Sequence, residues 1–146
     1  SALADSGLAP NHLTLEITET ALATNPEAAA ATLAGIRSLG VSIAVDDFGT
    51  GYSSLSYLTR YPIDKIKIDR SFVRDLGVDL NDTAIINAIL AMAHSLGIKV
   101  VAEGVETHAQ LMYLIEHACD EAQGYYFGKA LPADQFKIPA KLSAPL

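Results

Sequence analysis

Residues 41–47 read Val41-Ser42-Ile43-Ala44-Val45-Asp46-Asp47, a short apolar run that ends in two carboxylates. Four similar runs occur elsewhere in the chain, and several are rich in Val and Ile and nearly continuous in apolar residues. Such runs are typical of parallel strands that are buried on both faces of a sheet. The sequence therefore predicts five strands, at residues 13–17, 41–45, 63–68, 98–102 and 123–127.

Helical patterns separate these runs, and recognisable caps mark their ends. Thr107, with Gln110 three residues later, fits a capping box at the start of a helix. Gly40 and Gly97 each follow a helical pattern and end it. The predicted helices begin near residues 26, 55, 82 and 107.

Strands and helices thus alternate as β-α-β-α-β-α-β-α-β, which predicts a parallel α/β fold with right-handed crossovers. Two architectures fit this order. A five-stranded doubly wound sheet suits a chain of 146 residues. A (β/α)8 barrel requires about 250 residues, so the chain would supply only its later strands. The pattern alone favours the open sheet, because that fold requires no missing part.

Composition restricts the function. The formal net charge of −7 argues against broad binding to DNA or RNA backbones, which requires clustered Lys and Arg. With Cys119 as its single cysteine, the chain has no internal disulfide framework, and a reducing compartment such as the cytoplasm is expected. No apolar run approaches 18 residues, so no membrane insertion is expected.

Polar residues gather near the ends of the predicted strands, and most of them are acidic. Because the carboxyl ends of parallel strands share one edge of a sheet, these side chains are expected to lie close together. Burying several carboxylates side by side is costly unless cations neutralise them. Oxygen ligands suit Mg²⁺ or Mn²⁺ better than zinc. The candidates are Glu16, Glu19, Asp46, Asp47, Lys67, Asp69, Glu103 and Glu106 at strand ends, and Gln123 at the start of the fifth strand.

Each candidate also has a simpler interpretation. A lone acidic residue at a strand end is usually a helix cap or a solvated loop residue, and Asp46-Asp47 fits a turn. Lys67 is harder to explain in this way, because it lies between Ile66 and Ile68, where an inward lysine is costly without a partner. Several such residues on one predicted edge favour a shared site.

Other sequence features give weaker signals. Gly49-Thr50-Gly51 is not followed by Gly-Lys-Ser/Thr, so we interpret it as a flexible loop rather than a phosphate cradle. Tyr125 and Tyr126 are interpreted as core or wall residues, and Cys119 as a packing residue. The four histidines share no metal-ligand spacing; they are His12, His94, His108 and His117.

Five motifs stand out between residues 15 and 127, and they are Leu15-Glu16-Ile17-Thr18-Glu19, Asp46-Asp47-Phe48-Gly49-Thr50-Gly51-Tyr52-Ser53-Ser54-Leu55, Ile66-Lys67-Ile68-Asp69, Ala102-Glu103-Gly104-Val105-Glu106-Thr107 and Gln123-Gly124-Tyr125-Tyr126-Phe127. A single motif would be a weak signal, but the set is highly specific. In the same order, these motifs resemble those of the EAL domain family of bacterial cyclic di-GMP phosphodiesterases.

The resemblance implies a partial TIM-type (β/α) barrel, with about five C-terminal β/α units and parallel strands. It also implies that residues 1–146 are the C-terminal portion of a single EAL domain. The Glu-Ala-Leu segment that names the family does not occur in the sequence. Its metal-binding glutamate, the arginine near it and a metal-binding asparagine are expected upstream of residue 1.

By the same resemblance, the site holds two divalent metal ions, Mg²⁺ or Mn²⁺. Glu16 is expected to be a metal ligand, Asp46 a ligand that bridges the two ions, and Asp47 a ligand of the second ion. Lys67 is expected to hold the attacking water, with a pKa lowered by the neighbouring metals. The remaining expected roles are ligand or orienting residue for Glu103, water positioning for Gln123, cofactor binding for Asp47 and Asp69, and tethering of loop 48–54 for Glu19.

The function implied is hydrolysis of cyclic di-GMP to linear pGpG, with this chain alone inactive. The alternative is a catalytically degenerate receptor that binds cyclic di-GMP. A homodimer through loop 48–54 and the following helix is expected. Its expected location is the cytoplasm, or the cytoplasmic part of a larger membrane-anchored or multidomain signalling protein. Two positions depart from common family wording: Ala118 replaces a usual glycine, and Lys129-Ala130 replaces a usual Lys-Pro.

Overall fold

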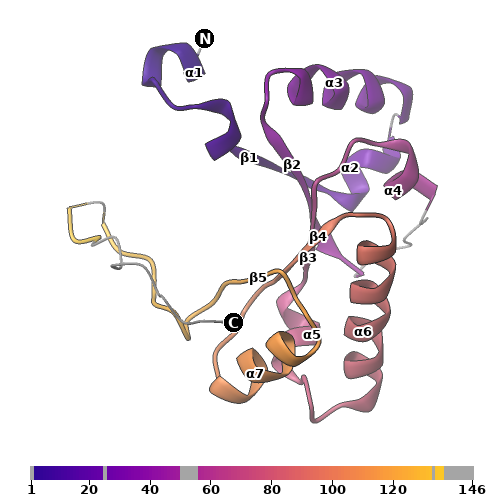
Figure 1. The fold of residues 1–146 in the computed structure, drawn as a ribbon, viewed down its shortest axis with the longest axis vertical. Helices are drawn as coiled ribbons and strands as arrows, with labels where there is room; N and C mark the ends of the chain where they lie inside the picture. The colour runs from indigo at the N-terminus through magenta and orange to yellow at the C-terminus, as the bar shows by residue number, and fades with distance from the viewer. Residues whose placement is uncertain (1, 25, 50–55, 133, 137–146) are drawn as a thin grey trace.

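The computed structural model describes residues 2–24, 26–49, 56–132 and 134–136, and Figure 1 shows how their helices and strands are arranged. The strands are β1 (Thr14–Thr18), β2 (Ser42–Phe48), β3 (Lys65–Ile68), β4 (Lys99–Ala102) and β5 (Glu121–Ala122). The helices are α1 (Ala2–Ser6), the 3-10 helix η1 (Pro10–His12), α2 (Glu19–Thr24), α3 (Pro26–Ser38), α4 (Ser56–Arg60), α5 (Arg70–Arg74), α6 (Leu80–Ser95) and α7 (His108–Glu116).

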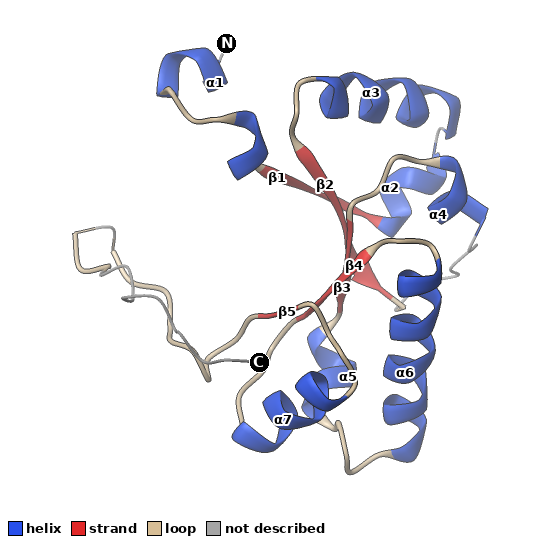
Figure 2. Ribbon diagram, in the orientation of Figure 1, coloured by secondary structure: helices blue, strands red, loops and turns tan. Residues whose placement is uncertain are grey.

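All five strands are parallel, and they pair in the order β1-β2-β3-β4-β5. With right-handed crossovers, a sequential order places successive helices on the same side of the sheet. Figure 2 shows this arrangement, with α2, α3, α4 and α6 on the convex side of a curved sheet. A doubly wound sheet would reverse its strand order. The open-sheet preference drawn from the pattern alone is therefore wrong, and the barrel-type arrangement is confirmed.

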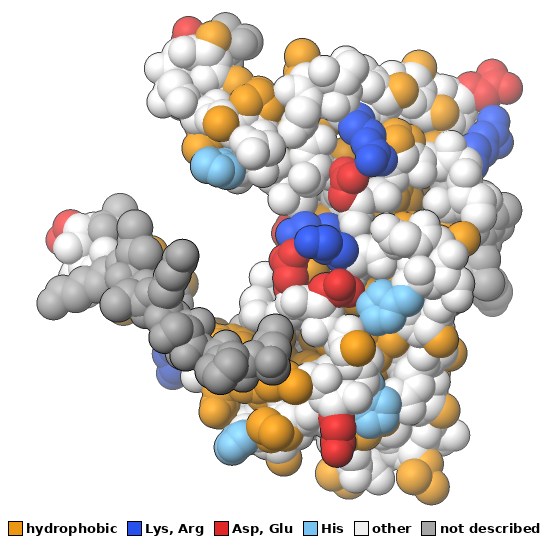
Figure 3. All heavy atoms as spheres, viewed as in Figure 1, with side chains coloured by type: hydrophobic (Ala, Val, Ile, Leu, Met, Phe, Trp, Pro, Cys, Tyr) orange, Lys and Arg blue, Asp and Glu red, His pale blue; other side chains and the backbone are white. Residues whose placement is uncertain are grey.

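The two faces of the strands differ in chemistry. Side chains that point toward the helices form the hydrophobic core, and Val45, Ile66, Ile68 and Val100 are all completely or almost completely buried there. The opposite, concave face carries polar and charged side chains, and Figure 3 shows both signs of charge gathered over the curved sheet. The concave surface is lined by Thr14, Glu16, Ala44, Lys65, Lys67, Val101, Glu121 and Gln123.

The first four predicted strands are found within a few residues of their expected bounds. The predicted capping box at Thr107 and Gln110 is present. The predicted start near Asp82 is two residues late, because Asp79 caps α6 by accepting from the backbone N–H groups of Asn81 and Asp82.

The fifth predicted strand, at residues 123–127, is wrong, since β5 ends at Ala122. The chain then bends around Val105, whose carbonyl accepts from the N–H of Tyr126 at 2.9 Å. A Cβ at Gly124 would lie 2.2 Å from the same carbonyl oxygen, so only glycine fits there. The shortened strand moves Gln123 from the start of β5 to its carboxyl end.

Across the residues that the structure describes, no helix has the length and apolar character needed to cross a membrane.

Candidate active site

Lys67 is the centre of the candidate site. It lies on β3, and its side chain points to the concave face yet is only 7% exposed. Its Nζ lies 2.7 Å from an oxygen of Glu16, 3.1 Å from one of Asp46 and 2.7 Å from one of Glu103. The three carboxylates come from β1, from β2 and from the residue that follows β4. Acidic side chains from separate segments therefore meet around one cationic group.

The surroundings of Lys67 control its charge. Burial is the largest influence and lowers the pKa of its ammonium group, but hydrogen bonds to Glu103, Glu16 and Asp46 together outweigh burial and raise this pKa above its ordinary value. The lowered pKa expected from the sequence referred to a lysine beside metal ions. With three carboxylates as its neighbours, the shift has the opposite sign, and Lys67 is a firmly held cation.

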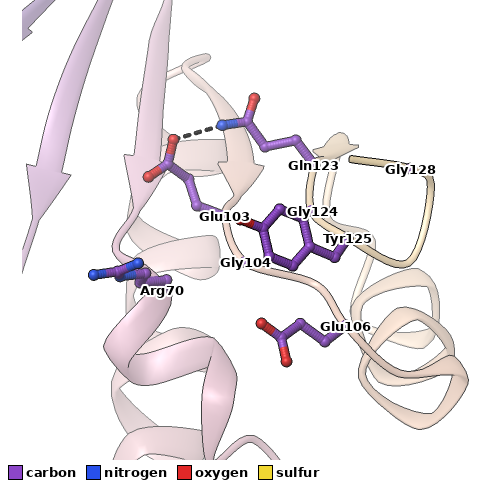
Figure 4. A pocket seen from close by; sticks show the side chains of 8 residues that line it. All are labelled: Arg70, Glu103, Gly104, Glu106, Gln123, Gly124, Tyr125 and Gly128. Atoms are coloured by element: carbon purple, nitrogen blue, oxygen red, sulfur yellow. Dashed lines mark hydrogen bonds between the residues drawn. The ribbon is translucent and has the colours of Figure 1, made fainter. Parts of the chain in front are cut away.

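Glu103 is held from two sides. Its Oε1 accepts from Lys67 Nζ at 2.7 Å and from Gln123 Nε2 at 2.6 Å. Figure 4 shows the contact with Gln123. The backbone N–H of Glu103 donates to the carbonyl of Ile68 at 3.2 Å, which ties the end of β4 to β3. Two donors, one on β3 and one just after β5, thus fix the orientation of a carboxylate that follows the intervening strand β4.

The end of β2 is irregular where its two carboxylates occur. The register between β2 and β3 shifts between Val45 and Phe48. Asp47 has a φ of 55°, in the left-handed region, and its N–H donates to Asp46 Oδ1 at 3.1 Å. Bulges of this kind are common beside active sites, where they change the direction in which a side chain points. The bulge breaks the simple alternation of the strand after Asp46.

A cavity of about 310 Å³ adjoins Glu103. Gly104 has a φ of 70°, and a Cβ at this position would lie 2.6 Å from the Cβ of Arg70, so glycine allows the start of α5 to pack on this loop. Figure 4 shows the lining residues, which are Arg70, Glu103, Gly104, Glu106, Gln123, Gly124, Tyr125 and Gly128. No sequence pattern indicated a role for Arg70. Tyr125 was predicted to lie in a strand as a core or wall residue, but its side chain is exposed.

Two other predicted site residues, Asp69 and Glu19, lie at the starts of helices. Asp69 caps α5 by accepting from the N–H of Ser71 at 2.9 Å. Burial alone would raise the pKa of the Asp69 carboxyl, but hydrogen bonds from Ser71 and Arg70 lower it. Glu19 is buried at the start of α2. Of the loop that Glu19 is predicted to tether, residues 50–54 lie outside the described residues.

The donor set can be compared with what a divalent metal requires. Within the described ranges, no group of three His, Cys, Asp or Glu side chains is arranged to hold a metal ion, and Lys67 Nζ contacts the three converging carboxylates instead. Those carboxylates nevertheless share one cation, and all of their donor atoms are oxygens. A hard ion such as Mg²⁺ or Mn²⁺ fits that donor set.

The fold and the site together define an arc of a (β/α) barrel with an acidic site at the carboxyl ends of its strands. The family model of the EAL domain matches residues 1–130, and the chain belongs to the EAL domain family.

Relatives of the chain include proteins named as phosphodiesterases. The cyclic di-GMP phosphodiesterase NbdA of Pseudomonas aeruginosa is 52% identical over 131 residues, which cover 90% of this chain and 17% of NbdA. The chain spans about a fifth of the length of the curated relatives it matches.

Solved structures share the fold. The PaMucR phosphodiesterase in complex with c-di-GMP has a TM-score of 0.87 at 46% identity, and the match covers 92% of this chain and 54% of that chain. The BlrP1 complex of Klebsiella pneumoniae with manganese and c-di-GMP has a TM-score of 0.79 at 39% identity, covering 86% of this chain and 32% of that chain.

Proposed function

We propose that this chain supplies the later β/α units of a cyclic di-GMP phosphodiesterase that produces linear pGpG. The convergence of Glu16, Asp46 and Glu103 on Lys67 is the observation that carries the proposal. The names of NbdA and of the PaMucR complex support the same substrate.

Four carboxylates would hold two divalent ions, namely those of Glu16, Asp46, Asp47 and Glu103. When bound, two such ions about 4 Å apart make a bound water more acidic and stabilise charge on a phosphodiester. BlrP1 was solved with manganese and with calcium, which supports the use of divalent ions without choosing between Mg²⁺ and Mn²⁺.

The chain's own residues then have distinct tasks. Lys67 carries N–H donors beside the three carboxylates, so it would orient the attacking water and offset charge that develops on phosphate oxygens. Gln123 would hold Glu103 in place and help to position the same water. The cavity beside Glu103 gives a phosphodiester nucleotide room next to these groups.

A catalytically inactive cyclic di-GMP receptor is the second candidate. One observation favours it: Lys67 Nζ contacts all three carboxylates, so a side-chain cation of the chain itself lies at the centre of this donor set. In a receptor of this kind, ligand binding would be insensitive to removal of divalent ions by EDTA, whereas hydrolysis requires them.

The test uses a chimera, called the MucR chimera below, in which the aligned segment of the MucR phosphodiesterase is replaced by this chain. We expect Mn²⁺-dependent conversion of cyclic di-GMP to pGpG, and loss of turnover by orders of magnitude for Glu103→Ala. We expect no turnover from the chain alone, since its 146 residues contain no Glu-Ala-Leu segment. A folded MucR chimera that binds cyclic di-GMP but never cleaves it would favour the receptor.

Two further proposals concern the surroundings of the protein. A homodimer through loop 48–54 and α4 is proposed, although residues 50–55 lie outside the described part of the chain. Light scattering of the MucR chimera at several concentrations tests it, and a monomer at every concentration would contradict it. A cytoplasmic site of action is proposed because the single cysteine, Cys119, suits a reducing compartment. Fractionation of cells that express the tagged protein tests it.

A further inference from the structure

Two β-α-β units of the chain repeat each other in sequence. Residues 37–46 read Arg-Ser-Leu-Gly-Val-Ser-Ile-Ala-Val-Asp, and residues 94–103 read His-Ser-Leu-Gly-Ile-Lys-Val-Val-Ala-Glu. Asp46 and Glu103 therefore occupy equivalent positions. The strands that complete the two units begin Asp-Lys-Ile-Lys at residues 64–67 and Asp-Glu-Ala-Gln at residues 120–123. Lys67 and Gln123 are thus equivalent as well.

The repeat extends to the contacts. Asp64 accepts from the backbone N–H of Ile43 at 2.9 Å, and Asp120 accepts in the same way from Val100 at 2.9 Å. In both units, an aspartate just before the second strand fastens that strand to the first. Each unit therefore presents a carboxylate and, from the neighbouring strand, a hydrogen-bond donor at the concave site.

At one inward position the two units carry opposite charges, and this difference creates an ion pair. Lys65 of the first unit is equivalent to Glu121 of the second. Lys65 Nζ lies 2.7 Å from both carboxylate oxygens of Glu121, and the two side chains are 23% and 41% exposed. The pair joins β3 to β5 across the intervening strand β4.

This ion pair matters most for β5. That strand has two residues, and its pairing with β4 consists of Val101 with Glu121 and Ala102 with Ala122. Residues two apart on a strand point to the same face, so Lys65 and Glu121 lie one layer below Lys67 and Gln123. Lys67 and Gln123 are the two donors that hold Glu103 Oε1.

We propose that Lys65 and Glu121 are positioning residues, whose ion pair links β5 to β3 across β4 and so keeps Gln123 and Lys67 on Glu103. The catalytic consequence rests on the proposed function, but the effect on β5 does not. Neither residue touches the reacting atoms in this proposal; both act through the strands that carry Lys67 and Gln123.

The first test measures amide hydrogen exchange in the chain itself. The backbone N–H of Gln123 donates to Ala102 at 2.9 Å, so its exchange reports whether β5 stays paired. Lys65→Met and Glu121→Gln should each speed exchange at Gln123 by about tenfold. Exchange at a short edge strand proceeds through local opening, and loss of the ion pair lowers the free energy of that opening. The charge-swapped double variant K65E/E121K should restore slow exchange. Unchanged exchange in both single variants would overturn the proposal.

The second test measures kinetics in the MucR chimera. A misplaced site residue lowers turnover without loss of binding, so K65M and E121Q should reduce kcat about tenfold with KM within about twofold. K65E/E121K should regain most of the lost kcat. Arg37→Met is the matched control, because it removes the 3.1 Å ion pair with Asp64 but changes no contact of β5. The kcat of this variant should equal that of the unaltered chimera.

The two tests separate the possible failures. An unaltered MucR chimera that folds but does not cleave cyclic di-GMP would contradict the proposed function, and the exchange at Gln123 would still decide the role of the ion pair. A fall in melting temperature with unchanged kcat in K65M and E121Q would show that the pair only stabilises the fold. A double variant no better than the single ones would also refute the inference.

Discussion

The C-terminal ends of α6 and α7 allow a matched test of backbone strain. Both helices end in the same hydrogen-bond pattern. Ile98 donates to the carbonyl of Ala93 at 2.9 Å, five residues back, and Cys119 donates to that of Leu114 at the same distance. This pattern is a Schellman motif, in which the residue before the donor adopts a left-handed conformation.

That residue is Gly97 after α6, with a φ of 71°, and Ala118 after α7, with a φ of 58°. Glycine adopts the left-handed region freely, whereas this conformation costs a residue with a Cβ about 1–2 kcal/mol. Glycine in turn loses about 0.5–1 kcal/mol more conformational free energy on folding. The difference predicts that Ala118→Gly raises the free energy of unfolding by about 0.5–1 kcal/mol.

Gly97→Ala is the reciprocal change and should lower the free energy of unfolding by a similar amount. A Cβ added at Gly97 would have no heavy atom within 4 Å, and Ala118 is exposed, so packing contributes little at either position. Urea denaturation followed by circular dichroism measures both variants, with an unchanged m-value as the sign that the surface exposed on unfolding is the same. A destabilised Ala118→Gly, or equal signs for the two variants, would refute the reasoning.

Three further predictions concern single groups. Burial alone would raise the pKa of the Asp120 carboxyl, but hydrogen bonds from Val100 and His94 outweigh burial and lower this pKa in the folded state. The contribution of Asp120 to stability is therefore present above its unfolded pKa and is lost as pH falls through its folded pKa. Asp120→Asn should flatten the acid limb of a plot of unfolding free energy against pH. Gly104→Ala should cost more than about 2 kcal/mol of unfolding free energy, because the new Cβ meets Arg70 at 2.6 Å and the φ is left-handed; thermal denaturation checks it, and a loss as small as that of Gly97→Ala would contradict it. Gln110→Met should cost about 1–3 kcal/mol in urea denaturation, since the buried amide serves four backbone groups; an unchanged midpoint would show that water replaces them.

Sequence periodicity predicted most of the elements, because caps and apolar runs are local signals. Strand order is not local, and the same pattern fits an open sheet or a barrel arc until the pairing is known. The fifth strand was misplaced because Tyr125, Tyr126 and Phe127 have strand-like composition, yet all three are exposed where the chain turns around Val105.

In the candidate site, too, local features could be predicted from the sequence and contacts that depend on strand pairing could not. The position of Lys67 between two isoleucines indicated an inward lysine, and its three carboxylate partners lay among the predicted strand-end residues. Lys65 has the same inward register two residues earlier, so its direction could have been inferred. Its partner could not, because contact with Glu121 requires that β3 and β5 flank the same strand.

Strand β3 shows why core and site depend on a single register. Its four residues, Lys65–Ile68, alternate between the concave face and the helix-facing core, and all four pair with residues 99–102 of β4. A slip of one residue would turn both lysines into the core and both isoleucines toward the carboxylates. The buried isoleucines oppose that slip through lost hydrophobic burial, and the lysines oppose it through desolvation of unpaired charge. The interactions that stabilise the fold at β3 therefore also place Lys67 within reach of Glu16, Asp46 and Glu103.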